Sequence, residues 1–342
     1  MGAVVPQARG FRSLPGLRVW EKAPLAPFTT IGTGGSAALL LSAVTPEGLI
    51  GVLRYLGDSE TPWFCLGGGS NLLVADRGYP GVVLKLDEGF QYVEGLPSIG
   101  AVCGGGPIET VSEAGEPQQT VSTGGRVMLV AGAGAFLARL ATVAAEVGLS
   151  GLEWACGIPG TLGGAVAMNA GAHGVSLSEI VDAIELTSNE GLRWIPRESL
   201  DFTYRYCALP AGSVVTAVRL RLSPGDPGEI LQRHRALLRV RRATQPRGSR
   251  TFGSAFRNPP GDSAGRLLDL AGLKGLRHGG AEISTVHANF IVNLGDATSG
   301  DVLYLMGLMR ETVLRSCGVP LEPEVKLLGA AFPWSEGLGS DG

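Results

Sequence analysis

The chain has 342 residues, of which 44% are hydrophobic and 17% charged, so it can bury a sizeable core and global disorder is excluded. Its formal net charge of −3 lacks the basic excess that is typical of a nucleic-acid-binding protein. No uninterrupted apolar run approaches the length of a membrane-spanning helix, so we expect no membrane span.

The first half of the chain is predicted to alternate short strands and helices after a poorly ordered tail at 1–25, which contains three prolines. Thr45-Pro46 predicts the start of a helix that reaches about Leu56, because a hydroxyl N-cap precedes a proline at the first helical position. Short strands are predicted at 63–66 and 82–86. The glycine-rich, largely polar segment 98–126 is predicted to be an exposed insertion or a long hairpin loop.

The second half has stronger helical signals. A strand at 127–130 is followed by a helix at 136–147, whose apolar face is expected to include Phe136, and further strands are predicted around 180–187 and 214–222. The clearest break lies at 223–228 and predicts a domain boundary. Helices are then predicted at 229–242, 264–271 and 301–317. The last of these has an apolar face made of Val302, Leu305, Met306, Met309 and Val313.

Two glycine-rich apolar loops are the most informative features. The first contains Gly67, Gly68, Gly69, Ser70 and Asn71, directly after the predicted strand at 63–66. Successive backbone N–H groups in such a loop can bind an anion, so we interpret it as a phosphate site rather than an ordinary tight turn.

The second loop is denser in glycine and covers residues 157–165. Its members are Gly157, Ile158, Pro159, Gly160, Thr161, Leu162, Gly163, Gly164 and Ala165. Glycines among buried apolar residues indicate main chain held close to a flat or anionic group, where a Cβ would clash. Two such loops predict a large bound cofactor that carries phosphate.

A Rossmann dinucleotide site fits the sequence poorly. Gly132-Ala133-Gly134 follows a strand and opens a helix, but Leu137 stands where the third glycine or alanine is needed. No acidic residue stands at a strand end about twenty residues further on. A P-loop motif is also missing from the sequence.

Five cysteines without C-x-x-C spacing predict free thiols in a reducing compartment, and four histidines without H-x-x-x-H spacing predict no metal site. The N-terminus lacks the pattern of a signal peptide, so we expect a cytoplasmic protein. Arg205, Ser254 and Glu324 each have an ordinary explanation when taken alone: a solvated guanidinium, a turn serine and a surface carboxylate.

Together, several segments resemble the UDP-N-acetylenolpyruvoylglucosamine reductase (MurB) family, in the order that this family shows. The segments are FTTIGTGGS at 28–36, LGGGSNLL at 66–73, GLEWACGIPGTLGGAVAMNAGAHG at 151–174, FTYR at 202–205, QP at 245–246, GSAFRNP at 253–259, AGLKG at 271–275, GGAEISTVHANFIVN at 279–293 and LEPEV at 321–325. The resemblance covers about 28–329, and the 98–126 insertion departs from it.

The resemblance implies an α+β protein with an FAD-binding fold of the vanillyl-alcohol oxidase type and a C-terminal α+β substrate-binding domain. It places the FAD-binding subdomains at 26–90 and 91–224 and the substrate-binding domain at 225–332, followed by a tail at 333–342. The loop at 67–71 would hold the FAD pyrophosphate, and the loop at 157–165 would run beside the flavin. A monomer is expected.

The implied reaction reduces UDP-N-acetylglucosamine enolpyruvate to UDP-N-acetylmuramate, a step of peptidoglycan precursor synthesis. NADPH reduces FAD, and a hydride then passes from flavin N5 to C3 of the enolpyruvyl group. Arg205 would meet the negative charge that develops, Ser254 would protonate C2, and Glu324 would orient the site.

Substrate contacts follow from the same resemblance. Tyr204 precedes Arg205 in the matching motif, whereas Arg241, Asn258, Lys274 and His287 would bind the UDP diphosphate, with Arg239 and Arg242 as alternatives to Arg241. Two other classes stay open: a flavin-binding protein without catalysis, and a nicotinamide-dependent dehydrogenase with a Rossmann domain.

Overall fold

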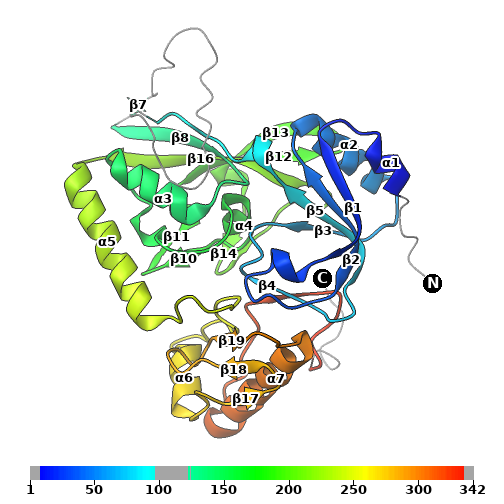
Figure 1. Cartoon of the computed structure of the whole chain (residues 1–342). Helices are drawn as coiled ribbons and strands as arrows, with labels where there is room; N and C mark the ends of the chain where they lie inside the picture. The colour runs from blue at the N-terminus through cyan, green and yellow to red at the C-terminus, as the bar shows by residue number, and fades with distance from the viewer. Residues whose placement is uncertain (1–7, 97–121, 124, 335–342) are drawn as a thin grey trace. The chain divides into compact units, whose positions relative to one another are not determined.

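The computed structural model describes residues 8–96, 122–123 and 125–334 (Figure 1). The chain divides into two compact units, each assembled from separate stretches. Unit 1 comprises residues 1–20, 40–68 and 83–240, and unit 2 comprises residues 21–39, 69–82 and 241–342. Most of the predicted insertion at 98–126 lies outside the described residues.

Within the described residues, the segment 8–25 contains regular structure, whereas the sequence predicted a poorly ordered tail at 1–25. It forms α1 (Ala8–Arg12) and β1 (Leu17–Pro24). Phe11 is fully buried, and its ring centroid lies 4.5 Å from that of Tyr55 on α2 (Pro46–Gly57). This apolar contact stabilises the segment, in which Pro15 lies in a turn and Pro24 is the last residue of β1.

Unit 1 is built on an antiparallel sheet in the order β13–β12–β16–β8–β6. These strands are β13 (Gly191–Pro196), β12 (Val181–Ser188), β16 (Val214–Pro224), β8 (Arg126–Gly132) and β6 (Val93–Glu94). β7 (Ser122–Thr123) pairs with β8, and β9 (Leu149–Ser150) pairs with β16. Alternating apolar side chains of β12 and β16 supply much of the core of this unit.

Two helices pack on this sheet, α3 (Leu137–Glu146) and α4 (Leu162–Ala167) (Figure 1). The predicted apolar face of α3 is buried through Leu137, Leu140 and Ala144. Phe136 differs from the prediction: it stands at the N-cap, is 55% exposed, and forms an isolated bridge with Thr161. Its extended backbone places the ring outside the helical stripe.

Unit 1 also contains several short strands. They are β3 (Trp63–Leu66), the hairpin of β10 (Gly171–Ala172) and β11 (Val175–Ser176), and the hairpin of β14 (Phe202–Thr203) and β15 (Tyr206–Cys207). After β16 the chain enters α5 (Pro227–Thr244), of which residues up to Val240 belong to unit 1. The predicted break at 223–228 therefore includes the end of β16, the connection at 225–226 and the start of α5, whereas the division into units falls after Val240.

A second sheet has the strand order β1–β2–β5–β3. β2 (Ser36–Ala43) and β5 (Tyr79–Leu86), like β1, continue from one unit into the other. Thr45 caps α2 as predicted, because its hydroxyl accepts a hydrogen bond from the Gly48 N–H at 3.2 Å.

Unit 2 combines a three-stranded antiparallel sheet with two helices. Its elements are β17 (Arg277–His278), β18 (Ala281–Ile283), β19 (Ile291–Asn293), α6 (Ala264–Leu270) and α7 (Ser299–Cys317). The predicted apolar face of α7 is confirmed, since all five of its residues are fully buried. Thr298 and Asp301 form a capping box at the start of α7, and Gly318 ends it at φ 69°.

Unit 2 also depends on residues from early in the chain. β4 (Leu72–Val74) pairs in parallel with β20 (Lys326–Leu328), and the Asp76 carboxylate accepts hydrogen bonds from the Ser299 and Gly300 N–H groups, both at 2.8 Å. Segments more than two hundred residues apart therefore share one core.

Candidate active site

The two glycine-rich loops touch each other within unit 1. A Cβ placed on Gly68 would lie 2.6 Å from the Gly160 Cα, and one on Gly67 would lie 2.8 Å from the Thr161 hydroxyl. Position 68 therefore needs glycine because a Cβ would clash with the protein's own main chain. The prediction from sequence had instead explained this glycine by contact with the cofactor. The two loops are neighbours in the structure, although residues 72–156 lie between them in the sequence.

The second loop is supported by the segment that begins with Gly132-Ala133-Gly134, which resembles part of a Rossmann motif. The Leu162 and Gly163 N–H groups donate to the carbonyls of Ala135 and Ala133, at 2.8 and 2.9 Å. The Leu137 N–H donates to the Gly160 carbonyl at 3.0 Å. The glycines of that motif permit close approach of the Phe90 carbonyl, which accepts a hydrogen bond from the Gly134 N–H at 2.8 Å.

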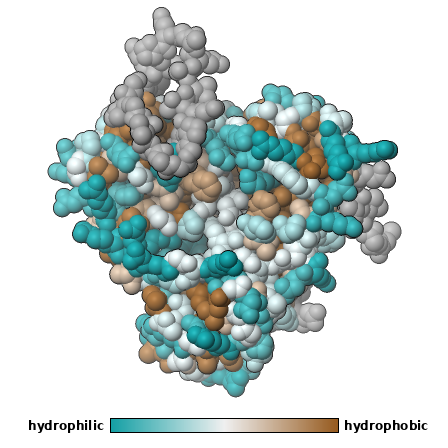
Figure 2. All heavy atoms as spheres, in the orientation of Figure 1, coloured by the Kyte–Doolittle hydropathy of each residue, from teal (hydrophilic) through white to brown (hydrophobic). Residues whose placement is uncertain are grey.

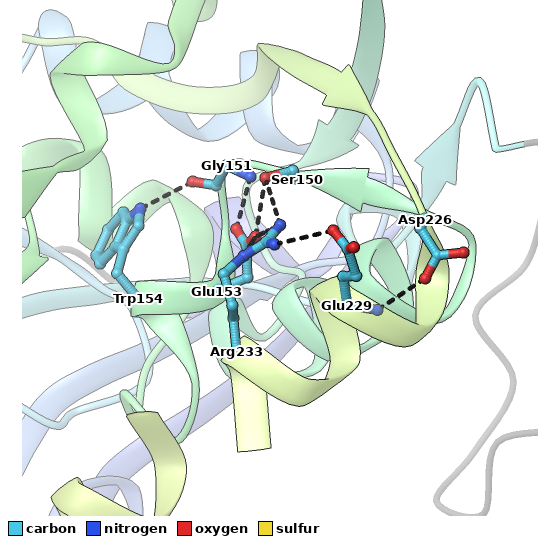
Figure 3. Close-up of polar contacts among 7 residues, drawn as sticks. All are labelled: Ser150, Gly151, Glu153, Trp154, Asp226, Glu229 and Arg233. Carbon is cyan, nitrogen blue, oxygen red and sulfur yellow. Dashed lines mark hydrogen bonds and ion pairs between the residues drawn. The ribbon is translucent and has the colours of Figure 1, made fainter. Parts of the chain in front are cut away.

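A buried carboxylate fixes the chain just before this loop (Figure 3). Glu153 is 8% exposed and accepts hydrogen bonds from the Gly151 N–H at 2.7 Å and the Ser150 hydroxyl at 2.8 Å. Arg233 of α5 pairs with it at 3.1 Å. Burial raises the pKa of Glu153, but these hydrogen bonds outweigh burial and hold its pKa below the usual value.

The space beside Gly164 provides a test of whether a cofactor fits. A Cβ on Gly164 would meet only the Thr161 hydroxyl, at 3.4 Å, in the described part of the chain. Gly157 and Pro159 are exposed, although the loop is flanked by buried apolar residues. Protein packing therefore accounts for Gly68 and Gly163 but not for Gly164, so the loop has open main chain against which a flat group such as a flavin fits.

The end of the first loop belongs to unit 2. Gly69 adopts φ 63°, and its carbonyl accepts a hydrogen bond from the Thr30 N–H at 3.1 Å. The Asn71 amide donates to the Glu324 carbonyl at 3.1 Å, and the Asn71 carbonyl accepts from the Lys326 N–H at 3.1 Å. The loop is thereby attached to the segment that carries Glu324.

Ser254 and Glu324 are brought together by backbone hydrogen bonds. The Glu324 N–H donates to the carbonyl of Ala255, next to Ser254, at 2.9 Å, and the Arg257 N–H donates to the Glu322 carbonyl at 2.9 Å. Ser254 also forms an isolated bridge with Phe290. Two side chains that are 70 positions apart in sequence therefore stand on adjacent extended segments of unit 2.

Asn289 stabilises the segment that carries Ser254. It is 2% exposed, its amide donates to the Phe256 carbonyl at 2.8 Å, and its side-chain oxygen accepts from the Phe256 N–H at 3.0 Å. The sequence analysis missed Asn289, although an asparagine within the apolar run HANFIV was a signal of a buried polar contact.

Arg205 stands at the tip of the β14–β15 hairpin in unit 1. Its φ is 60°, which is unusual for a side chain larger than glycine. The guanidinium donates through Nη1 to the Gly171 carbonyl at 3.0 Å, and Cζ lies 5.3 Å from the centroid of the Tyr204 ring. Tyr204 itself is 53% exposed.

Three of the residues predicted to bind UDP surround α6. The Asn258 side-chain oxygen accepts from the Ala264 N–H at 3.1 Å, and a Cβ on Gly265 would lie 2.6 Å from the His287 ring. Burial, followed by the charge of Lys274, lowers the pKa of His287. Lys274 pairs with Asp269 at 2.9 Å. Arg241 lies apart from this group in the chain, in the last turn of α5.

Other features of the described residues lie away from these side chains. A cavity of about 520 Å³ is lined by Lys22, Arg77, Tyr79 and neighbouring residues of unit 2, and it contains none of the predicted site residues. In the described ranges no group of acidic, histidine and cysteine side chains could hold a metal ion, and the four described cysteines are not joined in disulfides.

No helix among the described residues is long and apolar enough to cross a membrane. On the face drawn in Figure 2, hydrophobic residues form separate groups among hydrophilic ones.

Two family models match the chain. The model described as "UDP-N-acetylenolpyruvoylglucosamine reductase, C-terminal domain" matches residues 245–328, and the one described as "FAD binding domain" matches residues 120–194. The mixed helices and strands of the structure agree with the α+β fold that the sequence predicted.

Relatives match over most of the chain. A UDP-N-acetylenolpyruvoylglucosamine reductase of Anaeromyxobacter sp. (strain Fw109-5) is 46% identical over 91% of this chain and 89% of the relative. One of Myxococcus xanthus is 42% identical over 96% of this chain and 98% of the relative.

A solved structure adds the fold. The crystal structure of UDP-N-acetylenolpyruvylglucosamine reductase (MurB) from Thermus caldophilus matches with a TM-score of 0.73 and 38% identity, over 91% of this chain and 99% of that one. The chain, with its FAD-binding domain and its C-terminal domain, belongs to the UDP-N-acetylenolpyruvoylglucosamine reductase (MurB) family.

Proposed function

We propose that this protein reduces UDP-N-acetylglucosamine enolpyruvate to UDP-N-acetylmuramate, with NADPH as co-substrate and FAD as cofactor, as an enzyme of peptidoglycan precursor synthesis. The observation that carries the proposal is the joining of Ser254, Glu324 and Asn71 by backbone and amide hydrogen bonds, in a chain of this family. A proton donor and a carboxylate are thereby attached to the end of a loop predicted to hold phosphate.

The two glycine-rich loops would hold the FAD. The loop at 67–71 presents its main chain to the pyrophosphate, and the open side of Gly164 faces the flavin. Bound there, FAD would supply hydride transfer, from NADPH in one half-reaction and to C3 of the enolpyruvyl group in the other. The glycines of the loops contribute rigid main chain, because they pack on each other and on Ala133.

Arg205 would stabilise the negative charge that hydride addition places on C2 and on the substrate carboxylate. Removing one such donor commonly lowers a rate by about 10²–10³. The hydrogen bond to the Gly171 carbonyl and the contact with the Tyr204 ring fix the orientation of its guanidinium. Little reorganisation is therefore needed when charge develops.

Ser254 would give its hydroxyl proton to C2. A serine hydroxyl is a weak acid, so transfer requires a strongly basic enolate-like acceptor and the exclusion of water. Glu324 would orient the donor and assist the relay of the proton, because the Ala255–Glu324 hydrogen bond holds its backbone beside the serine segment.

The UDP diphosphate would bind near α6, through Lys274, His287 and Asn258, with Arg241 as a further cation. Lys274 and His287 are close enough for the charge of Lys274 to lower the pKa of His287. A diphosphate between them would offset that repulsion and raise the pKa of His287.

Absorption spectra test the proposal directly. We expect the purified protein to be yellow, to bleach with NADPH, and to recover its colour when UDP-N-acetylglucosamine enolpyruvate is added without oxygen. Yellow protein that never bleaches would indicate flavin binding without catalysis. Colourless protein that fails to bind added FAD would favour a nicotinamide-dependent dehydrogenase and reject the proposal.

A further inference from the structure

We infer that Asn169 is the positioning residue for Arg205. It holds the β14–β15 hairpin, which carries Arg205, in a fixed position relative to the loop at 157–165 that is predicted to lie beside the flavin. The inference rests on the proposed function, because it concerns the residue that would meet the substrate's developing charge. Asn169 itself is 7% exposed and lies in the chain just after α4, so it acts through its hydrogen bonds rather than by touching substrate.

The asparagine amide bridges two segments with both of its polar atoms. Nδ2 donates to the Thr203 carbonyl at 2.9 Å, and Oδ1 accepts from the Ser178 N–H at 3.1 Å. Thr203 pairs with Tyr206 in the β14–β15 hairpin, so the Thr203 carbonyl stands at the first corner of the turn that contains Arg205. Asn169 thereby fixes the backbone from which the guanidinium projects.

The same segment holds the other end of Arg205. The guanidinium donates to the carbonyl of Gly171, only two residues after Asn169. One short stretch, 169–171, therefore fixes both the turn and the charged group of Arg205, whose own φ of 60° is unfavourable without such support.

This stretch is continuous with the loop predicted to lie beside the flavin. The Asn169 N–H donates to the Val166 carbonyl at 3.0 Å, and the Ala170 N–H donates to the Ala165 carbonyl at 2.8 Å. Asn169 adopts φ 38°, a conformation that asparagine tolerates better than most residues. Residue 169 therefore needs both a left-handed backbone and an amide that donates and accepts at once.

Two substitutions separate these requirements. Asn169→Asp keeps the shape and the acceptor for Ser178 but removes the donor and sets a carboxylate against the Thr203 carbonyl. Asn169→Gly keeps the backbone conformation and removes both side-chain bonds. Thr187→Val is the matched control, because it removes another buried hydrogen bond of unit 1, between Thr187 and Thr216 at 3.1 Å.

The experiment measures the two half-reactions of the FAD-loaded enzyme by stopped-flow absorption, with melting temperature and flavin content for each variant. Both Asn169 variants should keep their flavin, be reduced by NADPH within about twofold of wild type, and be reoxidised by the enolpyruvyl sugar about 10- to 100-fold more slowly, as expected for misplacement of a catalytic group. Thr187→Val should lower the melting temperature and leave both rates unchanged.

A double substitution identifies the residue through which Asn169 acts. In an Arg205→Ala background, Asn169→Gly should slow reoxidation by less than about twofold more, because residues that act as one unit are not additive. Full additivity would overturn the inference, as would normal reoxidation in both Asn169 variants. If Arg205→Ala alone reoxidised normally, the proposed role of Arg205 would fail first and the inference with it. If Asn169→Asp does not fold, Asn169→Gly decides.

Discussion

Single residues account for the proposed chemistry, and Ser254 has the most specific task. The structure places it on an extended segment, between the bridge to Phe290 and the hydrogen bond of Ala255 to Glu324. Its backbone is thus fixed from two sides, as a positioned proton donor requires.

Ser254→Ala should leave flavin reduction by NADPH within about twofold and slow reoxidation by the enolpyruvyl sugar by about 10²–10⁴, the usual contribution of a positioned acid. The measurement is stopped-flow absorbance of each half-reaction. Ser249→Ala is a suitable control, because Ser249 is exposed and its hydroxyl donates to the carbonyl of Arg247, two residues away, at 3.4 Å. Equal slowing of both half-reactions would contradict the assigned role.

Two glycines of the loops should respond differently to substitution. Gly164→Ala should retain or raise stability, because the new methyl group meets only the Thr161 hydroxyl and alanine favours a helix by about 1 kcal/mol, but it should lower FAD occupancy. Gly68→Val should lower both stability and FAD occupancy, because its side chain would meet the Gly160 main chain.

Flavin absorbance per protein and the melting temperature of the apoprotein distinguish the two variants. Fully yellow Gly164→Ala protein would show that FAD does not lie against this glycine.

At the scale of elements, buried polar contacts set the position of each loop. Glu153 fixes the chain before the second glycine loop, Asn169 fixes the Arg205 hairpin and Asn289 fixes the Ser254 segment. Each is a buried polar residue within an apolar stretch of sequence. Sequence patterns predict that such a residue needs a partner, but the partner is distant in the chain and so cannot be read from local periodicity.

Glu153 makes part of the stability depend on pH. Its pKa is lower in the folded than in the unfolded protein, so its stabilising contribution is present above the unfolded value, near 4.5, and is lost as pH falls through the folded value. Glu153→Gln should therefore cost about 1.5–3 kcal/mol at pH 7, the range for hydrogen bonds to charged groups, and progressively less below about pH 4.5.

Urea unfolding of both proteins between pH 3 and 7 measures this difference. A cost that is equal at pH 3.5 and pH 7 would show that the carboxylate charge is not responsible. Glu229→Gln provides the control, since that residue pairs with the same Arg233 at 3.9 Å but remains exposed.

At the scale of the whole molecule, unit 2 is not a continuous piece of chain. The Asn293 amide donates to the Ile31 carbonyl at 2.9 Å, Asp76 caps α7, and β4 pairs with β20. A fragment of residues 241–342 would lose all three contacts. We expect it to lack a cooperative unfolding transition by circular dichroism, while the full chain shows one. A fragment that folds cooperatively alone would contradict this division of the chain.

The sequence by itself determined the local elements and the type of chemistry. Apolar periodicity predicted the buried faces of α3 and α7, hydroxyl and proline signals predicted the start of α2, and the motifs predicted the family. These signals act over a few residues, where backbone sterics and side-chain burial are set by neighbours in the chain. Only the tertiary structure decided that Gly68 packs on Gly160, that residues 133–137 support the second loop, and that Glu324 stands beside Ser254. Those contacts are made by segments that meet only after folding. Local sequence patterns therefore do not indicate which distant carbonyl will accept a hydrogen bond from a given N–H group.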